Sequence, residues 1–180
     1  MSAAIDTNDM NCEFVFACRH NDVERAKILL SQGADINFRF PFDNLTALHC
    51  AAKKGHKDIV KFLLQHGNLD IHAISEKKKQ TALHMACRNN YTEIALMIIN
   101  DARSIYEKDN PEKQCLLEFR DYQNRLALHS ACLHKNETLF RALMEYPVYC
   151  DFDFEINDLL GLAGNNKVIR NEIFKYFEEE

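Results

Sequence analysis

The chain of 180 residues lacks the sequence signatures of several functional classes. Its five glycines form neither a GxGxxG nor a GxxxxGK[ST] motif, so nothing indicates a dinucleotide site or a phosphate-binding loop. The seven cysteines include no CxxC pair, and no spacing typical of zinc ligands occurs. We therefore expect no metal, no cofactor and no catalytic residues.

Long apolar runs and a strong excess of one charge are also missing. No apolar segment approaches the ~18 residues that a membrane-spanning helix needs. Residues 1–14 contain neither a basic region nor an apolar core, so we expect no signal peptide. The formal net charge of −5 is too mild to favour nucleic acid or an anionic membrane as the partner.

The segment 46–67, TALHCAAKKGHKDIVKFLLQHG, can be read as two short helices joined by a tight turn. Thr46 is a good N-cap, because its hydroxyl can accept a hydrogen bond from an orphan amide of the first turn. Gly55 and Gly67 can end the two helices, since glycine adopts the left-handed conformation at little cost. So small a helix pair cannot bury its own apolar face and needs neighbours of the same kind.

Such neighbours are present. The letters TALH return at 81–84, and LALH follows at 126–129. In each copy an alanine of the first helix precedes an aliphatic residue by twelve positions. These alanines lie at steps of 34, 35 and 45 residues, and they are Ala17, Ala51, Ala86 and Ala131. The pattern predicts a stack of similar helix pairs.

Two parts of the chain depart from this spacing. The step of 45 residues predicts an insertion at about 102–119, either as an extended helix or as a long finger that breaks at Pro111. A fifth, weaker copy would place Asn157 at the N-cap, Leu162 at the alanine position and Phe174 at the aliphatic position. Insertions in repeat proteins often lie on the binding face, so the inserted segment is a candidate functional element.

A period near 33 residues with a TPLHxA-like signature is typical of ankyrin repeats. From residue 13 to near its end, the chain resembles the ankyrin-repeat family. The resemblance implies an all-α solenoid of about five helix-turn-helix repeats with short β-hairpin fingers. It implies an N-terminal tail at 1–12 and a repeat domain at 13–180, with repeats at about 13–40, 41–75, 76–120, 121–150 and 152–180.

The resemblance also implies a structural role for the histidines of the repeated motif, His49, His84 and His129. In the family this imidazole binds the threonine of the motif and a nearby backbone group. Leu126 replaces the threonine in the fourth repeat, so we expect a weaker joint there. His49 and Cys50 are neighbours on one helix and do not face each other, so they do not form a catalytic pair by themselves.

The cysteines are expected to be reduced. Cys18, Cys87 and Cys132 share one repeat position, where a small buried residue is wanted and a free thiol serves as one. Reduced thiols indicate the cytoplasm, with the nucleus as a further candidate compartment. The alternative is the disulfide framework that is typical of secreted proteins.

Members of the family typically bind other proteins through the fingers and the concave face of the first helices. The expected partner-binding residues are Arg19, His20, Phe40, Phe42, Lys53, Lys54, Lys77, Lys78, Lys79, Arg88, Asn89, Leu133 and His134. The basic helix positions form either a solvated face or an electropositive groove for an acidic segment. The phenylalanines either pack under neighbouring helices or form a contact patch, and the lysines form either a solvated turn or a partner contact.

We therefore expect a monomeric, non-enzymatic protein-interaction module, acting as a scaffold, adaptor or inhibitor, whose partner is another protein, with an acidic segment as a candidate feature. Two alternatives stay open. The chain would be a secreted bacterial or viral effector that uses the same surface in the host cytoplasm, or a cysteine-dependent enzyme built on the same scaffold. Nucleic-acid binding through the lysines is a third class, and the negative net charge argues against it.

Overall fold

The computed structural model describes residues 7–109, 115–145 and 156–178. The described residues form ten α-helices and one short 3-10 helix, and no strand is assigned among them. The first helices of the five repeats are α1 (Thr7–Arg19), α3 (Ala47–Lys54), α5 (Ala82–Arg88), α7 (Ala127–Leu133) and α9 (Ile156–Ala163). The second helices are α2 (Val23–Ser31), α4 (Lys57–Leu64), α6 (Thr92–Asp109), α8 (Glu137–Met144) and α10 (Lys167–Glu178). The all-α solenoid is therefore confirmed.

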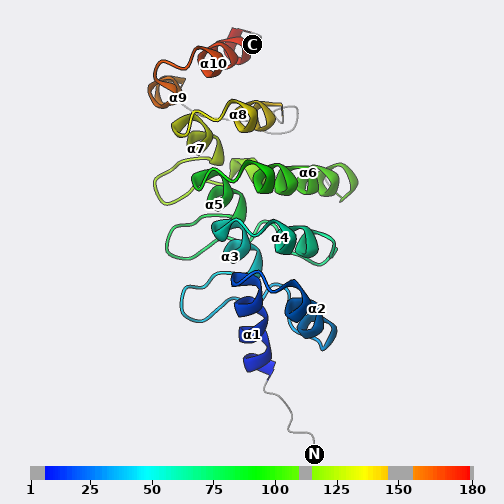
Figure 1. Ribbon diagram of the computed structural model, residues 1–180. Helices are drawn as coiled ribbons and strands as arrows, with labels where there is room; N and C mark the ends of the chain where they lie inside the picture. The colour runs from blue at the N-terminus through cyan, green and yellow to red at the C-terminus, as the bar shows by residue number, and fades with distance from the viewer. Residues whose placement is uncertain (1–6, 110–114, 146–155, 179–180) are drawn as a thin grey trace, which may run out of the picture.

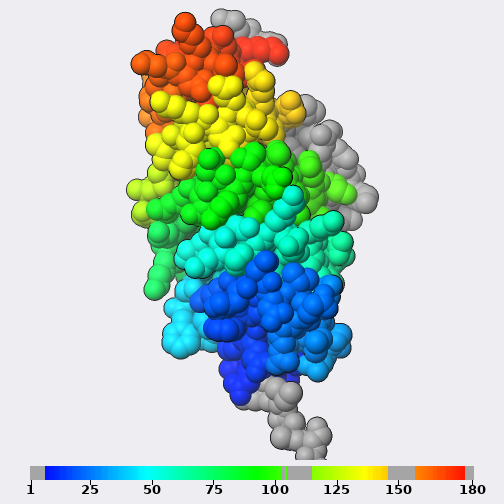
Figure 2. Space-filling view, viewed as in Figure 1, coloured from blue at the N-terminus to red at the C-terminus, as the bar shows by residue number. Residues whose placement is uncertain are grey.

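The helices form two layers of an elongated stack (Figure 1). The first helices α1, α3, α5 and α7 follow one another in one layer, and α2, α4, α6 and α8 follow in the other. Helices α1 and α10 lie at opposite ends of the stack. Figure 2 shows the repeats as successive bands, which agrees with the rule that each unit of a solenoid contacts mainly its neighbours.

The core runs between the two layers. Small residues of the first helices allow close approach, and Ala51 and Ala52 of α3 are fully buried. Each of the last four second helices buries two aliphatic side chains spaced by four positions, which share one face of a helix. These pairs are Ile59 and Leu63, Ile94 and Ile98, Leu139 and Leu143, and Ile169 and Ile173.

Three loops precede α3, α5 and α7, and we call them the first finger (38–45), the second finger (73–80) and the third finger (119–125). They project from the same side of the stack (Figure 1). Each is closed by two backbone hydrogen bonds; in the second finger, Ser75 N donates to Gln80 O and Lys79 N to Ser75 O. The expected β-hairpins are not seen, because these bonds close a tight turn and no ladder continues beyond it.

The N-terminal part of the domain begins earlier than the expected boundary at residue 13. Helix α1 starts at Thr7, inside the segment 1–12 that was expected to form a tail. Met10 is buried against the first repeat, and Asn11 Oδ1 accepts a hydrogen bond from Asp35 N at 2.7 Å. These contacts hold the N-terminal part of α1, which starts before the expected first residue of the repeat, against the first repeat.

The insertion of the third repeat extends its second helix. Helix α6 has 18 residues, against 8 in α4 and in α8. It covers Thr92–Asp109, so the expected form with an extended second helix is the one observed. Residues 110–114 lie outside the described part, and the chain then forms the 3-10 helix η1 (Leu116–Glu118).

The fifth repeat is present, with a one-residue shift from the expected register. Ile173 is fully buried, whereas Phe174, expected at the aliphatic position, is 41% exposed. Asn166 caps α10 by accepting the Ile169 amide at 3.0 Å. Asn157, expected at the N-cap of the first helix, lies inside α9, which begins at Ile156, so this expectation is wrong. Helices α3 and α4 begin ten residues apart, whereas α9 and α10 begin eleven residues apart, so the turn of the fifth repeat is one residue longer.

One cysteine differs from the expectation. Cys115 is disulfide-bonded, so the expectation of reduced thiols is wrong for this residue. Cys115 lies in the inserted segment and not at the repeat position that favours a small buried residue, so the packing argument does not apply to it. Cys150 lies outside the described residues, and the free cysteines are Cys12, Cys18, Cys50, Cys87 and Cys132.

Candidate functional site: a basic groove between fingers and first helices

Buried histidines fix the starts of the first helices and join successive repeats. The Thr46 hydroxyl donates to His49 Nδ1 at 2.8 Å, so Nε2 carries the ring proton and donates to Gln80 O in the next repeat at 3.0 Å. His84 repeats this arrangement with Thr81, and its Nε2 lies 3.2 Å from Arg125 O. The structural role expected for these histidines is confirmed.

The fourth repeat keeps only part of this joint. Leu126 N donates to His129 Nδ1 at 3.1 Å, but Leu126 has no hydroxyl. No bond from His129 Nε2 to a following repeat is present among the described residues. The joint has fewer hydrogen bonds, as expected from the loss of the threonine. Burial lowers the pKa of all three imidazoles, to about 4 for His49.

The three fingers are connected to one another. Arg39 of the first finger donates through Nη1 to Ile74 O of the second at 2.8 Å. Tyr122 N of the third finger donates to Lys78 O of the second at 3.0 Å. These bonds tie the middle finger to both of its neighbours, so its side chains are presented from a supported backbone.

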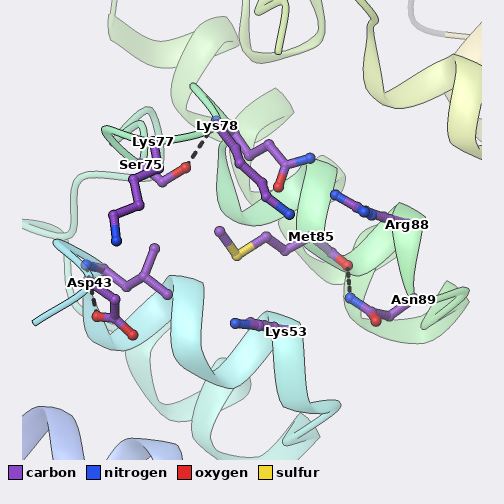
Figure 3. A pocket seen from close by; sticks show the side chains of 10 residues that line it. Asp43, Lys53, Ser75, Lys77, Lys78, Met85, Arg88 and Asn89 are labelled. Carbon is purple, nitrogen blue, oxygen red and sulfur yellow. Dashed lines mark hydrogen bonds between the residues drawn. The ribbon is translucent and has the colours of Figure 1, made fainter. Parts of the chain in front are cut away.

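A pocket of about 330 Å3 opens between the first two fingers and the helices α3 and α5 (Figure 3). Figure 3 shows the side chain of Lys78 extending from its finger toward Met85, with Lys53 and Arg88 beside the same hollow. Five of the expected partner-binding residues line it together. They are Lys53, Lys77, Lys78, Arg88 and Asn89.

The four cations of this pocket have no acidic partner. In the described part of the chain, none of Lys53, Lys77, Lys78 and Arg88 forms an ion pair. The one carboxylate in the lining, Asp43, already binds Arg19 Nη2 at 2.7 Å. The pocket therefore carries an excess of positive charge at its rim.

The remaining expected residues lie along the same face but have individual contacts. Arg19 is engaged by Asp43, and its guanidinium lies 4.8 Å from the centroid of the Phe40 ring. Phe42 at the tip of the first finger is 85% exposed, whereas Phe40 is half-buried against the core. Packing against neighbouring helices thus applies to Phe40, and Phe42 stays a predicted contact residue.

Of the other expected contact residues, Lys54 and Lys79 are exposed and do not line the pocket, and Leu133 is 54% exposed. His20 packs its ring on Phe16, with ring centroids 4.0 Å apart. His134 Nε2 lies 2.8 Å from Arg88 O in the preceding repeat, so this side chain contributes to a repeat joint.

Sequence reasoning missed Asp43 and Met85. The signal for Asp43 was its place three positions before the cap Thr46, because this position lies beside the last turn of the preceding first helix. Met85 is 7% exposed and forms the apolar part of the pocket. Met85 occupies the repeat position that Cys50 occupies in the second repeat. The larger side chain at this position was the signal that the sequence offered.

The buried thiols are poor nucleophiles. Burial raises the pKa of Cys18, Cys87 and Cys132 to about 12. Burial also raises the pKa of Cys50, and the nearby Arg19 guanidinium opposes this shift without reversing it. A catalytic cysteine needs the opposite shift, so these four residues act as packing groups.

No group of three or more histidine, cysteine, aspartate or glutamate side chains in the described ranges is arranged to hold a metal ion. None of the helices described is both long and apolar enough to span a bilayer.

Comparison with known proteins gives a family model for ankyrin repeats (3 copies) that matches residues 14–110. A human protein, transient receptor potential cation channel subfamily A member 1, is 36% identical over 83 residues, which cover 46% of this chain and 7% of that protein. A putative ankyrin repeat protein of fowlpox virus is 31% identical over 98 residues, which cover 53% of this chain and 28% of that protein. The NF-kappa-B inhibitor cactus of Drosophila yakuba is 30% identical over 148 residues, which cover 80% of this chain and 28% of that protein. The chain thus spans less than a third of the length of each of these relatives.

Proposed function

Because the chain belongs to the ankyrin-repeat family, we propose that it is a protein-interaction module whose basic groove binds an acidic segment of a partner protein. Scaffold, adaptor and inhibitor are the roles that such binding would serve. The relatives include a protein named as an inhibitor, which makes the last of these roles a specific candidate. We further propose that the chain acts as a monomer in the cytoplasm or nucleus.

The observation that carries this proposal is the set of cations without acidic partners in the pocket between the first two fingers. Some surface cations elsewhere are paired with a carboxylate, such as Lys57 with Glu93 at 2.8 Å. An acidic segment lying in the groove would supply the missing charges. Such complementarity mainly sets the association rate and the specificity of binding.

The test is capture from candidate cell lysates, with chemical crosslinking and mass spectrometry. The wild-type chain is compared with a variant in which Lys53, Lys54 and Arg88 are changed together to glutamate. All three side chains are exposed, so the variant should keep its helical circular dichroism spectrum. We expect a partner that is captured by the wild type alone and crosslinked through acidic residues to the second finger. Equal capture by both proteins, with an intact fold, would contradict a basic binding groove.

Two alternatives are distinguished by other samples or by another assay. A viral or bacterial effector would use the same groove on host proteins, and the similarity to the fowlpox protein favours keeping host lysates among the samples. A cysteine-dependent enzyme would need a thiol that reacts rapidly with iodoacetamide at neutral pH. The raised pKa of the four buried thiols favours the binding role over this one.

A further inference from the structure

One repeat position decides the charge of the groove. The residue three positions before the cap is Asp43 in the first finger, Lys78 in the second and Gln123 in the third. In the first case it faces the cation of the preceding first helix, and Asp43 binds Arg19. In the second case the cation of the preceding helix is Lys53, and a lysine stands where its partner would be.

The lysine at this repeat position creates a candidate site for an anion. Lys53 and Lys78 line one pocket with like charges, and like charges on one pocket repel each other unless an anion lies between them. Lys77 and Arg88 add two more cations to the same lining. The second finger cannot relieve this repulsion easily by moving away, because hydrogen bonds tie it to both neighbouring fingers.

We propose that this pocket binds the phosphorylated serine or threonine side chain of a partner segment. The proposal rests on the proposed function and specifies its acidic group. A phosphate carries a charge of about −1.5 to −2 and three acceptor oxygens, so one group can satisfy several of the four cations at once. A single carboxylate would leave most of them unpaired.

The shape and the floor of the pocket agree with a side chain of this kind. Its volume of about 330 Å3 accommodates a phosphorylated side chain together with ordered water. Met85 and Leu45 supply an apolar floor for the aliphatic part of the ligand. Arg88 can bind two phosphate oxygens at once, while the lysines act as point charges.

A peptide segment of a partner protein fits better than a nucleic acid or a lipid surface. Four cations line one pocket, and the neighbouring finger presents the apolar ring of Phe42, 85% exposed, for contact with the rest of a peptide. Nucleic acid would require cations that follow a long backbone, and the chain carries a net charge of −5.

The test uses three peptide libraries with identical degenerate flanks and a fixed central residue: phosphoserine, serine or glutamate. The full chain is immobilised, captured peptides are identified by mass spectrometry, and the dissociation constant of the most enriched phosphopeptide is measured by fluorescence anisotropy. We expect enrichment of the phosphoserine library, and at least tenfold weaker binding when phosphoserine is replaced by serine.

The matched variants are Lys78→Asp and Lys61→Glu, which change the charge by the same amount. Lys78→Asp recreates the arrangement of the first finger and gives Lys53 an internal partner. It should therefore weaken binding of the phosphopeptide at least tenfold while the protein stays folded. Lys61 is exposed on α4 and does not line the pocket, so its variant should bind within about twofold of wild type.

Several results would overturn the inference. These are no enrichment of phosphopeptides, undiminished binding by Lys78→Asp, or tighter binding to anionic phosphoinositide vesicles than to any peptide. Equal capture of the glutamate library would also overturn it, but would leave the acidic-segment proposal standing. The lysate comparison of wild type with the triple glutamate variant tests the acidic-segment proposal separately, because that comparison does not depend on phosphorylation.

Discussion

Mild acid should destabilise this protein through its buried histidines, and His49 is the clearest case. Its imidazole is 1% exposed, accepts the Thr46 hydroxyl at Nδ1 and donates from Nε2 to Gln80 O. A second ring proton, at Nδ1, would face the Thr46 amide N–H. It would also remove the acceptor for the hydrogen bond that the Thr46 hydroxyl donates. The folded state therefore keeps this histidine neutral.

The size of the effect follows from the pKa of His49, which burial lowers from 6.5 to about 4. The unfolded chain binds the proton more tightly, so the stabilisation is complete above pH 6.5 and is lost as the pH falls toward 4. The full loss is about 3 kcal/mol, and about 2 kcal/mol of it is already gone at pH 5. This is a large fraction of the stability of a small domain.

The assay is urea unfolding followed by circular dichroism at 222 nm, at several pH values between 7.5 and 5. His49→Gln removes the titrating group, and His20→Gln is the matched control, because His20 is exposed. Between pH 7.5 and 5, the variant at 49 should lose about 2 kcal/mol less than wild type, while the control should follow wild type. Other acid-sensitive groups cancel in this comparison.

The reasoning would be refuted if His49→Gln and wild type lost stability in parallel. A nuclear magnetic resonance measurement of the ring nitrogens gives a second check that needs no variant. Protonation of both nitrogens of His49 at pH 6 in the folded protein would contradict the hydrogen-bond assignment.

Three further predictions concern single positions. Lys79 adopts φ of +48°, so Lys79→Gly should raise the free energy of urea unfolding by about 1 kcal/mol, and no gain would show that the finger is unstrained. Gly55 adopts φ of +80°, and an added Cβ would lie 2.8 Å from Cζ of Tyr91. Gly55→Ala should therefore lower the free energy of unfolding by about 2 kcal/mol, which a lower thermal midpoint would report. Cys87 is fully buried and burial raises its pKa to about 12, so iodoacetamide at pH 7 should modify it only as fast as the protein unfolds; rapid labelling of the folded chain would contradict its packing role.

The sequence predicted those features that depend on local capping and on the repeat period. The threonine and histidine at 46 and 49 determine the start of α3 by contacts within one turn, and the repeat places a carbonyl where Nε2 can reach it. The long step between the third and fourth repeats required extra residues, and an extended second helix was one of the two forms expected for them. Both inferences needed only spacing and residue type.

Features that depend on contacts between different repeats were harder to predict. The pairing of Arg19 with Asp43 joins residues 24 positions apart, and it requires knowing which finger position faces which helix. The shifted register of α10 depends on a turn that is one residue longer than the turn between α3 and α4. The disulfide of Cys115 lies in the insertion, where the repeat gives no guidance.

For the candidate site, the sequence supplied the cations but not their arrangement. Lys53 and Arg88 were identified by their repeat positions, and the lysines of the second finger by their composition. That they share one pocket follows only from the folded chain. The sequence grouped Arg19 with these residues, but the structure separates it, because its charge is already satisfied.

The histidine joints also give the stack a direction. Each imidazole belongs to one repeat, and the carbonyl that it binds belongs to the repeat on its C-terminal side. Fraying from the C-terminal end therefore uncovers the ring of the preceding repeat, which can then take up a proton, whereas fraying from the N-terminal end uncovers only a carbonyl that water can solvate. The last histidine, His129, already lacks such a carbonyl among the described residues. In weak acid the array should thus unzip from its C-terminal end, one repeat at a time.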